Sequence, residues 1–270
     1  LADARTSFIN ALLQFTNLTN IEEIKRKNLD AINVLLNICV SDGNHLNSSW
    51  TDVLMCISQL ERLQLIAQGV DASNIPDVLN AKVEKTLNND GRTSHESIRS
   101  FNTKFFSRRL ANPSELAQQH HANQKLHPEI ASLIASTELT VKIDKIFAST
   151  EKLDIDAITF FIEALIEVAL DEVESSGNSS HPRIFSLQKM VDICYYNMGR
   201  IRVEWSRLWS IMGESFNKIG CNFNMNIVIF ALDSLRQLSM RFFEIEELAY
   251  FKFQKDFLKP FAFVLSHNEA

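Results

Sequence analysis

The sequence contains few of the residues that break helices or crosslink a chain. Among its 270 residues there are 7 glycines, 5 prolines and 4 cysteines. The glycines are scattered, which excludes a glycine-rich loop of the kind that cradles a phosphate group. The cysteines are widely spaced and mostly lie within apolar segments, so we expect small buried side chains in a reducing compartment, with neither disulfides nor zinc ligands. They are Cys39, Cys56, Cys194 and Cys221.

Charge and hydropathy exclude further classes of protein. The formal net charge is -6, whereas a general nucleic-acid binder usually carries a basic stripe, so we expect no nucleic-acid partner. No apolar run approaches the ~20 residues of a membrane-spanning helix. No segment alternates with the period of two that is typical of strands. The first residue is Leu and no signal-peptide pattern follows, which suggests a piece of a longer chain.

Helical periodicity dominates what is present. Between His181 and Phe261, three apolar stripes with helical spacing follow one another with short spacers. Gly199 is expected to end the first helix in the left-handed conformation. Gly220 is expected to end the second helix, and Asn224 or Asn226 to cap the third. Consecutive helices with short connectors pack antiparallel. The sequence therefore predicts an all-α array of antiparallel helical hairpins, a solenoid of the HEAT or armadillo kind.

The same spacing predicts helices in the rest of the chain. Asn20 and Glu23 suggest a capping box at the start of a second helix. One continuous helix is expected from Pro128 to Phe147, and Asp154 or Asp156 is expected to cap the next. Pro260 is expected to interrupt the last helix. The other expected helices cover residues 1–17, a stretch from Ser48 or Ser49 to Gln68, and a stretch ending before a polar loop at 174–180.

We interpret residues 1–270 as one regulatory helical-array domain. Its periodicity fails in a polar segment at about 71–97, predicted to be a mobile insertion, and in a looser connecting segment to about 127. Within the latter, residues 98–109 have the pattern of a basic amphipathic helix. Such a helix either docks its phenylalanines on the array or contacts an anionic membrane surface or an acidic partner. The candidate membrane-contact residues are Arg99, Phe101, Lys104, Phe105, Arg108 and Arg109.

No motif indicates catalysis or a bound cofactor. His120, His121 and His127 cluster near Glu115 and Glu129, but their spacing matches no standard set of metal ligands. No local signature joins a serine or cysteine to a histidine in a nucleophilic triad. We therefore predict no catalytic residues, no cofactor and no metal.

Arginine and tyrosine side chains near one helix junction are candidates for partner binding. Each arginine has two possible roles, since a guanidinium either holds carbonyls and carboxylates within the array or contacts a partner from a groove. The candidate partner-binding residues are Tyr196, Asn197, Arg200, Arg202, Arg207 and Arg236.

The same stretch resembles a known family. The segments HPRIFSLQKMVDICYYNMGRIRVEWSRLW, FNKIGC, FALDSLRQLSMRF and FQKDFLKPF are similar to the large Arf guanine-nucleotide exchange factors of the trans-Golgi network, the Sec-seven or brefeldin A-inhibited type. KIFASTEKLD at 145–154 and ISQLERLQLI at 57–66 extend the resemblance. The region resembled is the first homology region downstream of the catalytic domain. No motif of the exchange domain appears, so this segment is not expected to catalyse exchange.

The resemblance implies a regulatory function. Regions of this kind are associated with recognition of membrane-bound, GTP-loaded Arf, which gives recruitment, positive feedback and relief of autoinhibition at the late Golgi. The implied partners are activated Arf and other domains of the parent exchange factor, and the implied location is the cytoplasmic face of the trans-Golgi network. The alternative is an architectural or dimer-arm segment that positions the catalytic domain without a GTPase contact of its own.

Overall fold

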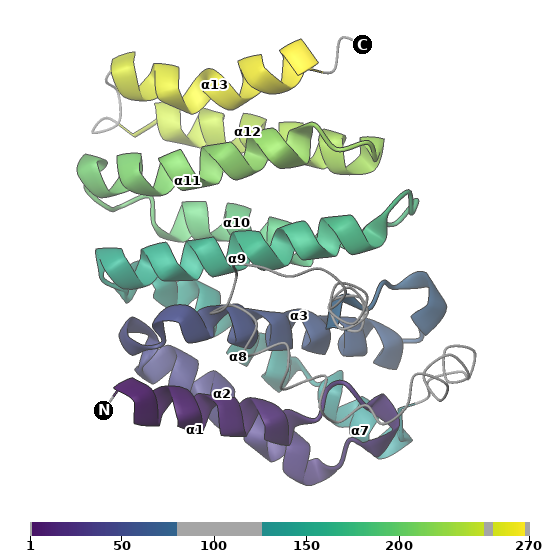
Figure 1. Cartoon of the computed structure of the whole chain (residues 1–270). Helices are drawn as coiled ribbons and strands as arrows, with labels where there is room; N and C mark the ends of the chain where they lie inside the picture. The colour runs from purple at the N-terminus through teal and green to yellow at the C-terminus, as the bar shows by residue number, and fades with distance from the viewer. Residues whose placement is uncertain (1, 80–125, 246–250, 268–270) are drawn as a thin grey trace, which may run out of the picture.

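The computed structural model describes residues 2–79, 126–245 and 251–267, and within these ranges every regular element is a helix (Figure 1). The predicted all-α array is confirmed. None of the described helices is long and apolar enough to cross a membrane. The α-helices are α1 (Ala2–Thr16), α2 (Arg26–Ser41), α3 (Trp50–Ala67), α7 (Pro128–Ile134), α8 (Thr137–Ala148), α9 (Ile155–Ser176), α10 (Phe185–Tyr196), α11 (Arg202–Gly220), α12 (Met225–Phe243) and α13 (Phe251–His267).

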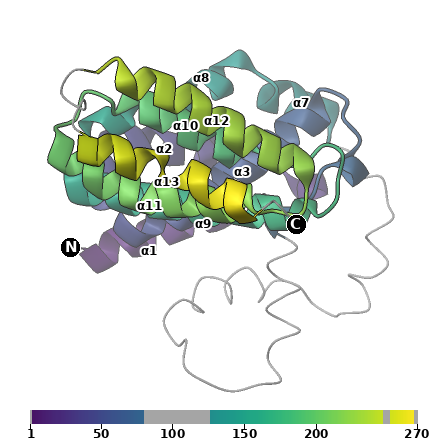
Figure 2. The same ribbon diagram turned by 90° about the horizontal axis from the view of Figure 1, so that it is seen from above.

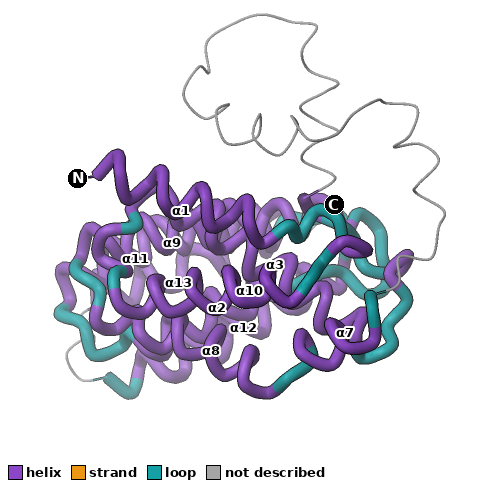
Figure 3. The backbone as a smooth tube through the Cα atoms, turned by 90° about the horizontal axis from the view of Figure 1, so that it is seen from below, coloured by secondary structure: helices purple, strands orange, loops and turns teal. Residues whose placement is uncertain are grey.

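The helices form two stacked layers. One layer contains α1, α3, α9, α11 and α13, and the other contains α2, α8, α10 and α12 (Figures 1 and 2). Helices adjacent in a layer contact one another, as α3 and α9 do, and the hairpins α1–α2, α9–α10 and α11–α12 join the two layers, while α7 packs against α3. The connectors gather at the two ends of the helices (Figure 3). A shared apolar core runs through the stack, because each amphipathic helix buries one face against the next.

Aromatic side chains occupy the centre of this core at two levels. Trp50 on α3 meets Phe161 on α9 edge to face, with ring centroids 4.6 Å apart. Higher in the stack, the ring of Trp209 on α11 stacks on that of Phe257 on α13 at 4.1 Å. Offset-stacked and edge-to-face pairs of this kind stabilise a core beyond the area they bury.

Several helix ends follow the sequence predictions. Asp154 caps α9, because its carboxylate accepts hydrogen bonds from the backbone N–H groups of Asp156 and Ala157. Asn224 caps α12 by accepting from the N–H of Asn226. In both cases a side chain satisfies donors that the first helical turn leaves without partners.

The predicted capping box at Asn20 and Glu23 is wrong. Asn20 makes no side-chain cap bond, and a short 3₁₀ turn at Ile21–Glu23 precedes α2. The start of α2 is instead fixed by Asn28, whose side chain accepts from the N–H of Lys25 at 2.7 Å and donates to the carbonyl of Phe15 at 2.6 Å. A contact with α1 therefore decides where α2 begins, and local spacing could not reveal it.

The helix expected from Pro128 to Phe147 is two helices. Pro128 starts α7 as predicted, but α7 ends at Ile134. Ser136 then caps α8, with its hydroxyl accepting from the N–H of Leu139. The hydroxyl of Ser136, between two apolar stripes, can bond a backbone N–H and so begin a second helix.

Gly220 ends α11 as predicted, whereas Gly199 does not end a helix in the predicted left-handed conformation, since its φ is not positive. The helix α10 ends earlier, at Tyr196. Gly220 is the last residue of α11, and a Cβ at this position would overlap the side chain of Val264 on α13. Gly220 therefore allows two helices to approach closely. Besides capping helices in the left-handed conformation, this is a second reason for a glycine in a helical protein.

Pro260 does not interrupt α13, which continues from Phe251 to His267. A proline inside a helix removes the N–H that would bond the carbonyl four residues earlier, here that of Asp256. The indole N–H of Trp209 donates to this carbonyl at 3.4 Å. Gly213 on α11 lies opposite the ring of Pro260 and leaves room for it. A neighbouring helix therefore compensates for the proline.

The first nine residues of the predicted insertion, 71–79, pack onto the array. Ile75, Val78 and Leu79 are buried, and Arg62 on α3 donates to the carbonyl of Ile75 and pairs with Asp77 at 3.1 Å. The packed chain thus extends further than the sequence pattern indicated. Residues 80–97 of the predicted insertion lie outside the described ranges, so their mobility stays a prediction.

The cysteines behave largely as expected from the sequence. All four are free; Cys39, Cys56 and Cys194 are buried, whereas Cys221 is exposed. Burial raises the pKa of the Cys56 thiol to about 12, and it raises the pKa of Cys39 and of Cys194 as well. Buried thiols of this kind stay protonated and unreactive at neutral pH.

Candidate functional site

The connector between α10 and α11 displays apolar side chains on the surface. Tyr196 is 42% exposed, Ile201 57% and Val203 74%. Arg202 lies between the two aliphatic residues and is also exposed. We call Tyr196, Ile201, Arg202 and Val203 the connector surface. Several exposed apolar residues and an arginine within one short segment are typical of protein interaction sites, in contrast to single scattered ones.

Asn197 holds the connector from beneath. It is only 1% exposed. Its amide nitrogen donates to the hydroxyl of Thr150 at 2.9 Å, and its amide oxygen accepts from Nε of Arg200 at 2.7 Å. Thr150 is itself fully buried in the 3₁₀ turn Ser149–Lys152 that links α8 to α9. The amide of Asn197 therefore joins two successive connectors through the interior.

Arg200 completes this attachment. Its guanidinium donates to the carbonyls of Thr150, at 3.0 Å, and of Leu153, and it pairs with Glu204 at 3.1 Å. The side chain is 10% exposed. A planar guanidinium with several donors suits such a set of fixed acceptors, which lysine could not satisfy in the same way. Asn197 and Arg200 thus have the architectural role, and they fix the backbone that carries the connector surface.

The other predicted partner-binding residues lie apart from this connector. Arg207 on α11 pairs with Asp156 on α9 at 3.2 Å, and both side chains are exposed. These two helices belong to the layer that contains α1, α3 and α13. Arg236 lies on α12 in the second layer, pairs with Asp233 at 2.8 Å and contacts the sulfur of Met240. A hydrogen bond joins Asn197 and Arg200, with Tyr196 and Arg202 close by in the sequence. Arg207 and Arg236 pair with residues elsewhere in the array. Partner contact by any of them stays a prediction.

The predicted membrane-contact residues, Arg99 to Arg109, lie outside the described residues. Of the histidine cluster, only His127 lies within them, together with its neighbour Glu129. In the described ranges, no three histidine, cysteine, aspartate or glutamate residues are placed to hold a metal ion.

Sequence reasoning missed Ile201 and Val203. Both are apolar but precede the stripe of α11 that begins at Trp205, and Val203 is out of register with its buried positions. A helical-periodicity analysis assigns apolar residues to the core and passes over those in a connector. The available signal was the alternation of Arg200, Ile201, Arg202 and Val203 directly after a glycine.

The chemistry of the connector surface suits binding. It offers an aromatic ring, two aliphatic side chains and one guanidinium. None of these is a general base at neutral pH, and the carboxylate nearest in sequence, Glu204, is occupied by Arg200. The apolar side chains can exclude water from a partner's apolar patch, and the guanidinium can donate hydrogen bonds to an anion or a carbonyl of the partner.

Comparison with known proteins places these features among relatives. A family model described as Mon2/Sec7/BIG1-like, HDS, matches residues 241–270. The chain is 54% identical over 268 residues to the ADP-ribosylation factor guanine nucleotide-exchange factor SEC7 of Saccharomyces cerevisiae. It is 47% identical over 264 residues to sec72 of Schizosaccharomyces pombe and 41% identical over 269 residues to the human brefeldin A-inhibited guanine nucleotide-exchange protein 1.

Each of these matches covers 98% of this chain. The chain spans 13% of the length of the budding-yeast relative and 14% of each of the other two. The similarity is thus to one part of much larger proteins.

Proposed function

Because this chain corresponds to a homology region of the Sec7- and BIG1-type guanine nucleotide-exchange factors for ADP-ribosylation factors, we propose that it is a non-catalytic regulatory domain that binds membrane-bound, GTP-loaded Arf. The single observation that carries the proposal is the connector surface at Tyr196, Ile201, Arg202 and Val203. It is an exposed apolar patch on a backbone that is fixed from within the array.

The rigidity of this patch supports a binding role. Ordering a flexible loop on binding costs free energy, and a connector that is already ordered avoids that cost. Tyrosine and arginine, which are enriched among the residues that dominate binding energy, stand beside two aliphatic side chains. At 57% and 74% exposure, the isoleucine and the valine offer apolar surface that a partner can cover.

In this proposal the domain acts within a larger exchange factor on the cytoplasmic face of the late Golgi. Binding to the Arf–GTP that the enzyme has produced retains the enzyme at the membrane, which gives recruitment and positive feedback. The same contact relieves an autoinhibited arrangement with other domains of the parent protein. Coupling of this kind requires that the domain prefer one nucleotide state of Arf over the other.

A second candidate function is purely architectural. It is favoured by exposed apolar residues away from the connector surface, on α12 and α13, which suit contacts with other arms of the parent protein. These include Met225, Ile229, Met240, Leu258 and Leu265. In that case the domain positions the exchange domain and makes no GTPase contact.

Flotation with liposomes tests the two functions. The purified domain is mixed with liposomes that carry myristoylated Arf loaded with GTP or with GDP, and with bare liposomes. We expect binding only with GTP-loaded Arf, lost in the double variant Ile201→Ser, Val203→Ser. The matched control is Val141→Ser on α8, which removes a valine that is 64% exposed elsewhere and should leave binding intact.

The remaining outcomes select other functions. Absence of binding to every liposome favours the architectural function. Equal binding to bare liposomes favours the basic segment as a membrane contact, and the change of Arg99, Lys104, Arg108 and Arg109 to Glu should then abolish it.

A further inference from the structure

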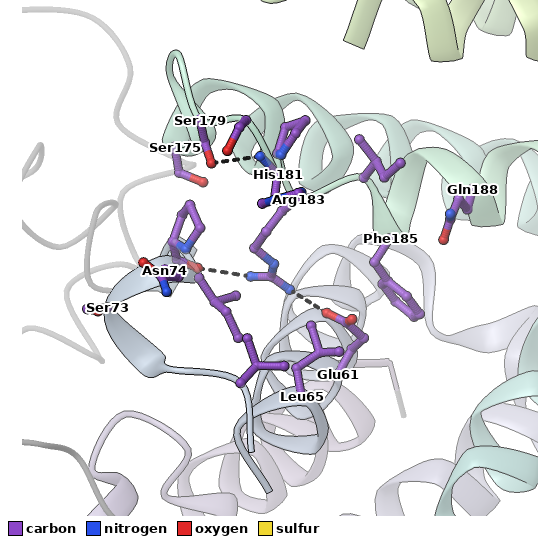
Figure 4. A pocket seen from close by; sticks show the side chains of 16 residues that line it. Glu61, Leu65, Ser73, Asn74, Ser175, Ser179, His181, Arg183, Phe185 and Gln188 are labelled. Atoms are coloured by element: carbon purple, nitrogen blue, oxygen red, sulfur yellow. Dashed lines mark hydrogen bonds and ion pairs between the residues drawn. The ribbon is translucent and has the colours of Figure 1, made fainter. Parts of the chain in front are cut away.

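A second site lies at the other end of α10 from the connector surface. A pocket of about 840 Å³ opens between the last turns of α3, the segment that follows α3, and the connector from α9 to α10 (Figure 4). Glu61 and Leu65 on α3, Val70 and Ile75 after it, and Phe185 at the start of α10 contribute to its walls. The backbone of Arg183 belongs to the α9–α10 connector, and its side chain reaches across to Glu61.

Arg183 is immobilised by its surroundings. Its side chain is 3% exposed. The guanidinium donates to the carbonyl of Ser58 at 2.7 Å and to that of Pro76 at 3.4 Å, and it pairs with Glu61 at 3.2 Å. Its Nε is buried without a hydrogen-bond partner. Arg183 is thus a fixed cation at the base of the pocket, and it cannot swing out to make way for a ligand.

Two carboxylates share this one cation. Glu172 on α9 is fully buried and lies 3.7 Å from the guanidinium. It accepts hydrogen bonds from the hydroxyl of Ser58 and from both the N–H and the hydroxyl of Ser186, so its oxygens are occupied. The neighbouring pair of Arg62 and Asp77 is neutral in itself. The cluster therefore carries one negative charge in excess.

Of the two carboxylates, Glu61 is the one that a ligand in the pocket can reach. Its side chain is 20% exposed and lines the pocket. Burial raises the pKa of the Glu61 carboxyl; Arg183 opposes the rise, and the nearby Glu172 carboxylate adds to it. Glu61 is partly desolvated, and it shares the one guanidinium of Arg183 with Glu172. Such a carboxylate is well suited to pair with a second cation.

The walls specify what kind of cation fits. Leu65, Val70, Ile75 and Phe185 provide apolar surface in a lining that also includes several serines, Asn74, His181 and Gln188. A hydrated metal ion gains nothing from such walls, whereas the long side chains of lysine and arginine bury an aliphatic stem while the charged end makes polar contacts. We propose that this pocket binds a lysine or arginine side chain of a peptide, with the cationic group at Glu61 and the stem against Leu65 and Phe185.

The basic peptide has two possible sources, this chain or another. The chain leaves the described array at Leu79, three residues after Pro76 in the pocket wall. The sequence from 80 to 125 contains eight basic residues: Lys82, Lys85, Arg92, Arg99, Lys104, Arg108, Arg109 and Lys125. The shared chemistry is the cationic side chain, and the experiment below distinguishes the sources.

The test uses a minimal probe, Nα-acetyl-lysine N-methylamide, titrated into the full chain labelled at isoleucine, leucine and valine methyl groups. We expect saturable NMR shifts of the methyl groups of Leu65, Val70 and Ile75. The neutral isostere Nα-acetyl-norleucine N-methylamide should shift them much less. Glu61→Gln should lower the affinity for the lysine probe by about tenfold, which corresponds to the loss of one hydrogen bond to a charged group.

The matched control is Glu163→Gln, which removes an exposed carboxylate of α9 that does not line the pocket and should leave the affinity unchanged. Unchanged α-helical circular dichroism in both variants establishes that each is folded. The proposal is overturned if the lysine and norleucine probes cause equal methyl shifts. It is also overturned if Glu61→Gln and Glu163→Gln bind the lysine probe with equal affinity.

A second arm changes the eight basic residues between 80 and 125 to Gln. Tighter binding of the probe by this variant identifies the chain's own segment as the competitor for the pocket. Unchanged binding assigns the natural ligand to a separate chain. Loss of the lysine-specific shifts in this variant, when it remains folded, would contradict the assignment of the pocket itself.

Discussion

The indole N–H of Trp209 donates to the main-chain carbonyl of Asp256, the carbonyl that Pro260 deprives of its partner within α13. A side chain of α11 thus repairs a defect in α13. The same indole ring stacks on Phe257, so one residue supplies both the hydrogen bond and the apolar contact that hold the last helix.

This repair can be measured with a double-mutant cycle. Trp209→Phe keeps a ring against Phe257 but removes the donor, so we expect the free energy of unfolding to fall by about 1–2 kcal/mol. In a Pro260→Ala background, the new N–H at 260 bonds the Asp256 carbonyl, and the same change should cost less by about 0.5 kcal/mol or more. Urea denaturation measures all four variants. Equal costs in both backgrounds would show that the indole N–H is not the partner of this carbonyl.

Gly220 allows the close approach of α11 and α13, so Gly220→Ala should be destabilising. Overpacking against Val264 is expected to cost about 1–3 kcal/mol, although alanine favours helix over glycine. Gly199→Ala is the matched control, because a Cβ there meets nothing within 4 Å, and it should be neutral. Adding Val264→Ala to Gly220→Ala should recover part of the loss. Thermal unfolding would count against this account if both alanine variants behaved alike.

Glu172 is the buried centre of the contacts between α3, α9 and α10, and Glu172→Ala should be severely destabilising. The change leaves Ser58 and Ser186 without their acceptor and removes a counter-charge of Arg183, for an expected loss of about 3–5 kcal/mol. Glu163→Ala, on the exposed face of the same helix, should change stability by less than about 0.5 kcal/mol. Chemical denaturation of both variants provides the comparison, and similar midpoints would refute the central role of Glu172.

Glu61 should make stability depend on pH. Because its pKa is raised in the folded protein above the ordinary value of 4.5, the folded state holds this proton more tightly than the unfolded chain. The resulting stabilisation is present at low pH and is lost as the pH rises through the folded-state pKa. The stability of wild type minus that of Glu61→Gln should therefore decrease as the pH rises above 4.5. A difference that is flat or increases over this range would contradict the raised pKa.

The sequence allowed the all-α array to be predicted, and it also revealed the resemblance to the Sec-seven type of exchange factor, which the comparisons confirm. Both depend on long, regular patterns: apolar stripes predict helices, and dense matching segments identify relatives. Helix ends were predictable where a local side chain fixes them, as Asp154 does. They were not where a distant residue decides, as with Asn28 and Phe15, or Trp209 and Pro260.

The candidate sites were less predictable. Tyr196 and Arg202 were expected at an interaction surface, and both are exposed in the structure. Ile201 and Val203, in the same short segment, are exposed as well, and periodicity could not distinguish them from core residues. Asn197 and Arg200 have the sequence signature of surface polar residues, yet their partners lie in a connector about 50 residues earlier, at Thr150 and Leu153. The pocket at Glu61 joins segments more than 100 residues apart, so no local motif could indicate it.

Three ties between connectors in the described part of the chain point the same way along the sequence. Arg183, Arg200 and Asn224 each donate to carbonyls of an earlier connector, those of Pro76, Thr150 and Gly177 among them. During synthesis, therefore, each finished hairpin presents acceptors that water can satisfy until the next hairpin brings the donor. In these three ties the later hairpin brings the donor to an acceptor that is already in place, and it thereby fixes the hairpin before it.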